Sequence, residues 1–158
     1  YCTRVGSGPF PTELFDETGR RIRDIGHEYG AVTGRERRCG WIDLVALRYA
    51  IMINGVTQLI MMKSDVLDGF DEIKACVAYE IDGKQVTDFP YSLDTVDVKP
   101  VYVTLPGWHT DMTAMKSEDQ FPQQFKDYIK FLEEQLATPI TIVSIGPDRE
   151  QTIVRSHS

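Results

Sequence analysis

The sequence has few cysteines and no long hydrophobic run. Its 158 residues include three cysteines, an odd number with no CxxC pair, so neither a disulfide framework nor a cysteine-based zinc site is expected. The longest apolar stretch, residues 42–62, is interrupted by charged and polar side chains and is too broken to cross a bilayer. The odd cysteine count fits a reducing compartment, so a cytoplasmic protein is expected. No signal segment is recognisable either, and the first residue, Tyr1, indicates a piece of a longer chain.

Several motifs of common catalytic sites are also missing. The glycine-rich residues 5–9 lack the GxxxxGK[ST] pattern of a phosphate-binding loop, and the chain has no HExxH motif for zinc. Its three histidines, His27, His109 and His157, accompany no recognisable Ser or Cys nucleophile motif. The sequence therefore predicts no catalytic residue and no metal ligand within this chain.

Lysine is absent from the first 62 residues. Residues 1–50 carry eight arginines against seven acidic residues, whereas residues 51–158 carry nine basic and seventeen acidic residues. Arginine presents a planar fork of donors that suits carboxylates and phosphates, so this part is expected to bind a small anion. With a pI near 4.9 and no basic stripe interleaved with aromatics, nucleic-acid binding is not expected.

The composition is otherwise that of a globular protein of one-domain length, with 42% hydrophobic and 26% charged residues. Residues 1–41 show no sustained hydrophobic period and should be mostly loops. Between residues 42 and 54 the apolar side chains cover nearly a whole helical circumference, which predicts a buried helix that ends at Gly55. The apolar run 59–62 predicts a strand covered on both faces in a parallel sheet.

The second half of the chain has clearer signals. Asp82-Gly83 predicts a hairpin turn between strands at 73–79 and 84–87, and residues 101–105 predict another strand. A helix opened by Pro122 and a strand at 140–143 follow. The helix has a single apolar stripe: Phe125, Tyr128, Ile129, Leu132 and Leu136. Together these elements predict an α/β fold with a mostly parallel sheet, flanking helices and a β-hairpin.

Three segments are candidates for ligand binding. Residues 33–38 place three arginines beside Gly34 and either bind an anion or form a solvated loop. Lys63-Ser64-Asp65 follows strand 59–62, where α/β sheets bind ligands, and an Asp there can accept both N1–H and the 2-amino group of guanine; a surface ion pair is the alternative. Residues 144–147 follow the other strand and either turn backbone N–H groups into the same crevice or form a plain turn. Both tryptophans, Trp41 and Trp108, are expected to be packing anchors.

Five segments, in order, resemble the C-terminal part of the adenylosuccinate synthetase family. They cover nearly the whole chain and are CTRVGSGPFPTEL (2–14), EYGAVTGRERRCGWIDLVALRYA (28–50), KSDVLDGFDEIKACVAYE (63–80), PVYVTLPGW (100–108) and SIGPDREQTI (144–153). The resemblance implies that residues 1–158 are a portion of a larger, P-loop-related α/β enzyme. Residues 1–41 would form its substrate-binding loops and residues 42–158 an α/β region with a guanine-base pocket.

The family ligates IMP and L-aspartate to adenylosuccinate for AMP biosynthesis, using GTP and Mg²⁺, through a 6-phosphoryl-IMP intermediate, and its members form homodimers. The phosphate loop, the catalytic Asp and His and the magnesium ligands of the family are absent from this chain, so we expect it to be inactive alone. The alternative is a guanine-nucleotide-binding module, or an inert structural fragment, without catalysis.

The resemblance also implies roles for particular residues. The GTP-binding residues would be Arg37, Lys63, Ser64, Asp65, Ser144, Ile145 and Gly146. The aspartate-binding loop would comprise Ala31, Val32, Thr33, Gly34, Arg35, Glu36 and Arg37. IMP would be bound by Val5, Gly6 and Arg35. Val32 departs from the Thr of many relatives, and the carboxylate of Glu36, between two arginines, is expected to point away from the site.

Overall fold

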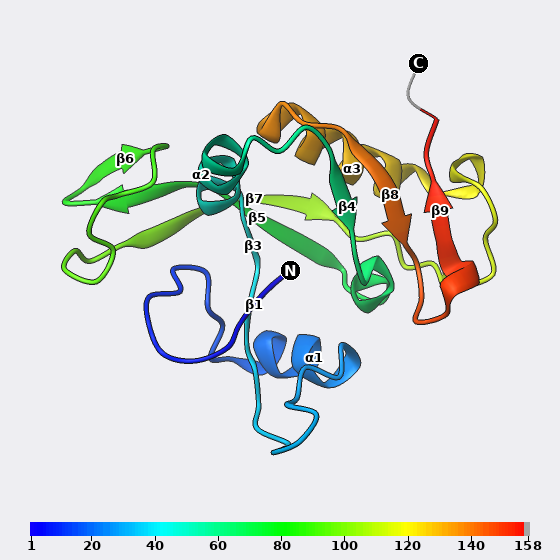
Figure 1. Cartoon of the computed structure of the whole chain (residues 1–158), viewed down its shortest axis with the longest axis horizontal. Coiled ribbons are helices and arrows are strands. Elements are labelled where there is room, and N and C mark those ends of the chain that lie inside the picture. Colours follow the sequence, from blue (N-terminus) through cyan, green and yellow to red (C-terminus); the bar gives the residue numbers. More distant parts are fainter. Residues whose placement is uncertain (157–158) are drawn as a thin grey trace. The chain divides into compact units, whose positions relative to one another are not determined.

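The computed structural model describes residues 1–156, and their contacts divide the chain into two compact units. The first unit comprises residues 1–49 and 74–104, and the second comprises residues 50–73 and 105–158. Figure 1 shows the elements of both. None of the helices in this described part of the chain is long and apolar enough to span a membrane.

The first unit begins with a two-stranded antiparallel sheet of β1 (Cys2–Arg4) and β2 (Arg38–Gly40). Helix α1 (Glu17–Ile25) lies between them in sequence, and the Asp16 side chain caps it by accepting a hydrogen bond from Gly19 N. The sequence predicted mostly loops here. The prediction missed this helix because it is only nine residues long and Ile22 is the one large side chain that it buries.

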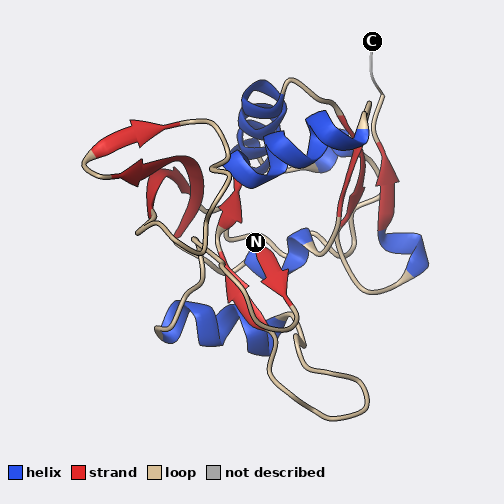
Figure 2. Ribbon diagram, turned by 60° about the vertical axis from the view of Figure 1, so that its left-hand side comes forward, coloured by secondary structure: helices blue, strands red, loops and turns tan. Residues whose placement is uncertain are grey.

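A second sheet of the first unit is built around β5 (Glu72–Ile81). It pairs in parallel with β3 (Ile42–Asp43), antiparallel with β6 (Lys84–Val86), and also with β7 (Lys99–Pro106). Ile81 faces Lys84 across a two-residue turn in which Asp82 and Gly83 have φ of 51° and 74°, as the hairpin prediction requires (Figure 2). The predicted strand at 101–105 is likewise confirmed as part of β7.

Helix α2 (Leu44–Asn54) corrects the predicted buried helix over 42–54. Its first two residues are buried, but Met52 and Ile53 are exposed, so the apolar circumference is not fully covered. Residues 42–43 form β3 instead, and Asp43 Oδ1 accepts hydrogen bonds of 3.0 Å from the N–H groups of Val45 and Ala46, which caps the helix. The predicted end is confirmed, since Gly55 follows the helix with φ of 61°.

The second unit contains a three-stranded sheet with the order β4-β8-β9. Strand β4 (Leu59–Met61) runs parallel to β8 (Ile140–Ser144), and β9 (Thr152–Val154) runs antiparallel to β8. The sheets are therefore mixed, which corrects the prediction of a mostly parallel sheet. Ile60 and Met62 are 56% and 65% exposed, so one face of this segment is uncovered and the predicted burial of residues 59–62 on both faces is wrong.

Helix α3 (Gln123–Leu136) is confirmed in detail. All five residues of its predicted apolar stripe are buried, and Ala137 ends the helix in the left-handed conformation. Trp108 packs on this helix, with ring centroids 4.7 Å from Phe125 and 5.6 Å from Tyr128. Both tryptophans are buried, which confirms that they are packing anchors.

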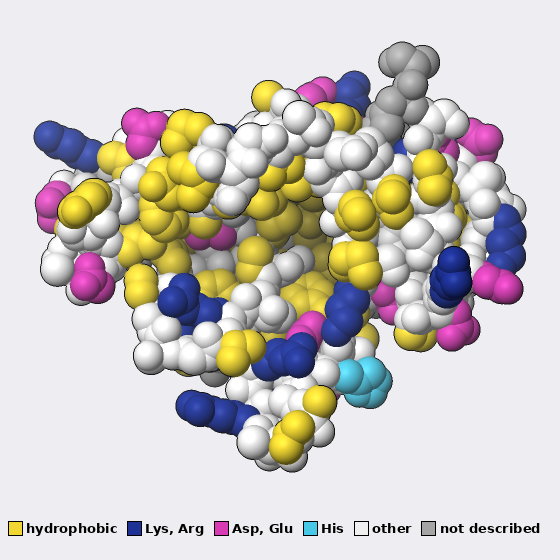
Figure 3. Space-filling model, in the orientation of Figure 1, with side chains coloured by type: hydrophobic (Ala, Val, Ile, Leu, Met, Phe, Trp, Pro, Cys, Tyr) yellow, Lys and Arg dark blue, Asp and Glu magenta, His cyan; other side chains and the backbone are white. Residues whose placement is uncertain are grey.

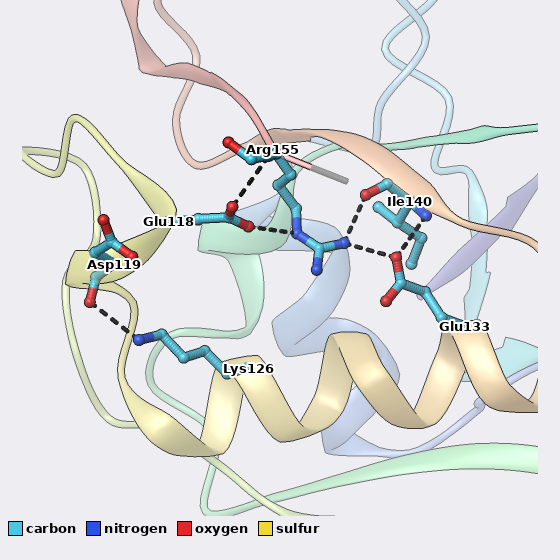
Figure 4. A network of polar contacts seen from close by, with 7 residues as sticks. Glu118, Asp119, Lys126, Glu133, Ile140 and Arg155 are labelled. Carbon is cyan, nitrogen blue, oxygen red and sulfur yellow. Dashed lines mark hydrogen bonds and ion pairs between the residues drawn. The ribbon is translucent and has the colours of Figure 1, made fainter. Parts of the chain in front are cut away.

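A cluster of charges holds the C-terminal strands of the second unit (Figure 4). Arg155, just after β9, donates from Nε to Glu118 Oε2 at 3.0 Å and from Nη1 to Glu133 Oε1 at 2.7 Å and to the Ile140 carbonyl at 2.6 Å. Glu118 opens the short helix η2 (Glu118–Gln120), and Glu133 lies on α3. One guanidinium therefore joins η2, α3, β8 and the end of β9. We call Arg155, Glu118 and Glu133 the Arg155 cluster.

Candidate functional site

A cavity of about 210 Å³ in the first unit brings together many of the predicted substrate-binding residues. We call it the arginine cavity. Its lining residues are Arg4, Val5, Gly6, Gly30, Thr33, Arg35, Glu36, Arg37 and Arg38. Ala31, Val32 and Gly34 of the predicted aspartate loop are not among them and are exposed. Figure 3 shows Lys and Arg side chains gathered over the part of the first unit that contains β1 and α1.

Arg37 is held in the arginine cavity by a buried carboxylate. Glu28, only 3% exposed, accepts hydrogen bonds from Arg37 Nη1 at 2.8 Å and from the Tyr1 hydroxyl at 2.6 Å. Arg23 Nε donates to the Arg37 carbonyl at 2.9 Å, so both the backbone and the side chain of Arg37 are fixed. A charge-assisted bond to a buried carboxylate orients a guanidinium strongly. Glu28 was not predicted from the sequence, because it lies nine positions before Arg37 with a loop between them.

Arg38 ties two loops of the arginine cavity together. Its Nε and Nη2 donate to the two carboxylate oxygens of Glu13 at 2.9 and 2.6 Å, and this bond raises the pKa of Arg38. Nη1 donates to the carbonyls of Gly6 and Gly8 at 3.1 and 2.9 Å. Arg38 therefore fixes the backbone beside Val5, where the family resemblance implies contact with IMP.

Arg35 differs from Arg37 and Arg38 in having an unpaired side chain among the described residues. Its side chain is exposed, and within residues 1–156 its guanidinium takes part in no hydrogen bond or ion pair. Its backbone is set by Thr33 Oγ1, which accepts from Arg35 N at 3.3 Å. Glu36 also lines the cavity, with its carboxylate 3.4 Å from Arg23 Nη1. The expectation that Glu36 points away from a bound anion stays a prediction. Within the described residues, every donor of the Arg35 guanidinium is available to bind an anion.

The two segments predicted to recognise guanine meet in the second unit. Strands β4 and β8 are parallel neighbours, with Met61 opposite Val143, so Lys63–Asp65 and Ser144–Gly146 follow them at the same end of the sheet. A hydrogen bond from Ser64 Oγ to the Ser144 carbonyl, at 2.5 Å, links the segments directly. Ser64 begins the short helix η1 (Ser64–Leu67), and Lys63 precedes it with φ of 55°. This arrangement matches the usual ligand position in α/β sheets.

Several polar groups of these segments are already used within the protein. Ser144 Oγ donates to the Gly146 carbonyl at 3.1 Å, and Ile145 N donates to the Gln151 carbonyl at 2.9 Å. Ile145 is fully buried, so its N–H does not turn into an open crevice as expected. Ser144 Oγ can still accept a hydrogen bond. Contacts of residues 144–146 with a base therefore stay a prediction.

Asp65 lines a second cavity, of about 460 Å³, which we call the Asp65 cavity. Its lining residues are Asp65, Asp68, Gly69, His109, Thr110, Asp111 and Thr113. Only Asp65 was predicted from the sequence. The others were not predicted, because residues 107–113 have no periodic pattern and because Asp68 and Gly69 lie beyond the predicted segment 63–65.

Two acidic groups of the Asp65 cavity, Asp68 and Asp111, have pKa values shifted in opposite directions. Burial raises the pKa of Asp68 to about 6, with Asp65 and Asp111 adding to the rise, although hydrogen bonds from Trp108 and Met112 oppose it. Hydrogen bonds from Thr113 lower the pKa of Asp111. Among the described residues no three His, Cys, Asp or Glu side chains are grouped so that they could hold a metal ion, and these acids are no exception.

Comparison with known proteins identifies the family. Residues 1–153 match the family model for adenylosuccinate synthetase. The chain belongs to this family. Adenylosuccinate synthetases from Phocaeicola vulgatus and Parabacteroides distasonis are each 72% identical to it over 155 residues, which are 98% of this chain but 36% of either relative. The chain therefore spans little more than a third of the length of these synthetases.

A solved structure supports the same assignment. The fully ligated adenylosuccinate synthetase from Plasmodium falciparum superposes with a TM-score of 0.92 and 38% sequence identity. The alignment covers 99% of this chain and 38% of the Plasmodium chain. The mixed α/β architecture described above is thus that of an adenylosuccinate synthetase segment.

Proposed function

We propose that this chain is the C-terminal portion of a GTP-dependent ligase that converts IMP and L-aspartate to adenylosuccinate. It contributes the guanine pocket, the aspartate loop and part of the IMP site. The observation that carries this proposal is the arginine cavity, where Val5, Gly6, Arg35 and Arg37, which come from separate loops, line one site. By analogy with the family, the complete enzyme is a cytoplasmic homodimer.

The arginine cavity suits anionic substrates. L-aspartate has two carboxylates and IMP has a phosphate, and guanidinium groups bind both in a bidentate manner. The Arg37 guanidinium is fixed by Glu28, whereas the Arg35 guanidinium has no partner among residues 1–156, so Arg35 can meet the ligand. Together the two positive groups lower the electrostatic cost of binding anionic aspartate beside anionic IMP.

The reaction proceeds in two transfers. The γ-phosphoryl group of GTP moves to the 6-oxygen of IMP, and the amine of aspartate then attacks carbon 6 and releases inorganic phosphate. Phosphorylation is needed because the 6-oxygen is otherwise a poor leaving group. Arginine side chains near the developing negative charge stabilise such steps.

The guanine of GTP is assigned to the end of the β4-β8 pair. The Asp65 carboxylate can accept hydrogen bonds from N1–H and from the 2-amino group, while the stem of Lys63 lies along the purine face. Adenine lacks this pair of donors. The direct link between Ser64 and Ser144 supports a common pocket for the two segments.

The Mg²⁺ that the family uses has no matching ligand cluster among the described residues, so no step is assigned to it here. The groups that activate the IMP oxygen are likewise expected outside this chain. We therefore expect the 158-residue polypeptide to be inactive by itself.

The test is to follow adenylosuccinate formation by ultraviolet absorbance with IMP, aspartate and GTP. The full-length enzyme should turn over and the 158-residue chain should not. In the full-length enzyme, Arg35→Gln should raise the KM for aspartate or IMP by about tenfold or more, the cost of about one charged hydrogen bond. Arg20→Gln, an exposed control on α1, should leave both unchanged. Turnover by the chain alone, or equal effects of the two variants, would contradict the proposal.

A further inference from the structure

A third segment, residues 107–113, lies beside the two segments that are assigned to guanine, residues 63–65 and 144–146. We call these two the guanine-recognition segments. Gly107 N donates to the Asp71 carbonyl at 2.8 Å, and a Cβ on Gly107 would lie 1.6 Å from the Phe70 carbonyl oxygen. This close approach places residues 107–113 against the turn that follows η1. Four of these seven residues line the Asp65 cavity: His109, Thr110, Asp111 and Thr113.

Asp68 joins this segment to Asp65. Its Oδ1 accepts from Trp108 Nε1 at 2.6 Å, and its Oδ2 accepts from Met112 N at 3.2 Å. At the same time Asp68 N donates to the Asp65 carbonyl at 3.0 Å, one turn of η1 away. One carboxylate thus fixes two points of residues 107–113 relative to the backbone of Asp65.

Gln151, in the short helix η3 (Arg149–Gln151), makes the matching connection on the other side. Its Nε2 donates to the Thr113 carbonyl at 3.1 Å, and its Oε1 accepts from Asp148 N at 2.9 Å. Its carboxamide also lies on Gly146, where an added Cβ would come within 2.1 Å of Oε1. Gln151 therefore joins residues 107–113 to the segment that follows β8.

We propose that Asp68 and Gln151 are positioning residues for guanine specificity: they clamp residues 107–113 onto the two guanine-recognition segments and so fix the backbone from which the Asp65 carboxylate reaches guanine. The inference rests on the proposed function, since it assumes that Asp65 meets guanine. Neither residue needs to touch the nucleotide. A hydrogen-bonding group discriminates well only when the structure around it is fixed, and here Asp68 and Gln151 fix residues 107–113 around the Asp65 cavity.

The role of Asp68 in the clamp requires a carboxylate. A carboxylate can accept from Trp108 and Met112 together, one donor per oxygen. An amide at this position would keep one acceptor and turn its NH₂ group toward the other donor. Asp68→Asn therefore loosens the clamp while it keeps the size of the side chain.

The test uses the full-length enzyme and compares GTP with ITP, which lacks the 2-amino group. In Asp68→Asn the KM for GTP should rise about tenfold with kcat little changed, as expected for one lost hydrogen bond. The preference for GTP over ITP in kcat/KM should fall about fivefold or more, because ITP depends less on the position of Asp65. The KM values for IMP and aspartate should stay the same. Asp119→Asn is the matched control, because this carboxylate also belongs to the second unit but is exposed and lies outside residues 107–113.

Gln151→Met gives an independent reading from the other side of the clamp. It should also lower the preference for GTP over ITP in kcat/KM. If Asp68→Asn does not fold, Gln151→Met alone tests the inference. An unchanged GTP preference in folded Asp68→Asn, or in Gln151→Met if that variant alone folds, would overturn the inference while the wild-type enzyme still makes adenylosuccinate. Absence of GTP-dependent product in the wild-type enzyme would instead overturn the proposed function.

Discussion

Replacing Arg155 with methionine should loosen the pairing of β8 and β9. The variant removes three side-chain hydrogen bonds of 2.6 to 3.0 Å, two of them to carboxylates. The side chains of Arg155, Glu118 and Glu133 are 17%, 29% and 23% exposed, so the Arg155 cluster lies between a surface pair and a buried one. Methionine preserves most of the aliphatic packing, so the effect isolates the charged head.

The magnitude follows from these contacts. Exposed ion pairs contribute about 0 to 1 kcal/mol, whereas breaking a buried pair costs about 3 to 5 kcal/mol. Glu133 Oε1 keeps its hydrogen bond from Ile140 N at 2.8 Å, so its carboxylate is not left without a donor. We therefore expect a loss of about 2 kcal/mol, or roughly a thirtyfold increase in local opening.

Hydrogen exchange followed by mass spectrometry measures this opening directly, in peptides that cover residues 140–144 and 152–154. Lys130→Met is the control, because its pair with Glu134 is 3.9 Å long and both side chains are more than half exposed, at 75% and 63%. The control should change exchange by less than about twofold. If Arg155→Met exchanged at the rate of the control, the account of the Arg155 cluster would be wrong.

Three other substitutions test other parts of the structure. Gly107→Ala should unfold or strongly destabilise the second unit, because its Cβ would lie 1.6 Å from a backbone oxygen; a melting temperature equal to wild type would refute this contact. The pKa of Asp68 is raised to about 6 by burial, so folding favours its protonated form, and the stability of wild type relative to Asp68→Asn should fall as pH rises from about 4 to about 6. Thermal denaturation of both proteins at the two ends of that pH range checks this. If the stability of wild type relative to Asp68→Asn rose with pH, the prediction would be contradicted. In the full-length enzyme, Glu28→Gln should raise the KM for aspartate several-fold, since an amide cannot accept from both Tyr1 and Arg37, whereas the exposed Glu17→Gln should not; equal kinetics for the two would count against this role.

The elements that the sequence predicted best are those whose pattern is local. The stripe of α3 and the Asp82-Gly83 hairpin follow from spacing and from the conformations that a two-residue turn demands, and both are confirmed. The parallel pairing of β4 with β8 agrees with the predicted α/β sheet, and it brings residues 63–65 and 144–146 to the same end of that sheet.

Other features depend on contacts between distant residues, which periodicity does not report. Strand β9 turns the sheet of the second unit into a mixed one, and the exposure of Ile60 and Met52 depends on what packs beside them rather than on their own hydrophobicity. The same holds for the sites. The arginines were evident from composition, but their orientation by Glu28 and Glu13 required the folded chain.

Asp65 of this segment is proposed to select guanine for the synthetase. Calorimetric titration of the full-length enzyme and its Asp65→Asn variant with GTP and with ATP tests it most directly. The wild-type enzyme should bind GTP in preference to ATP, and Asp65→Asn should weaken GTP binding by about 10- to 100-fold while leaving ATP binding unchanged, because an amide cannot accept both guanine donors. Equal GTP affinity in the two proteins would contradict the account.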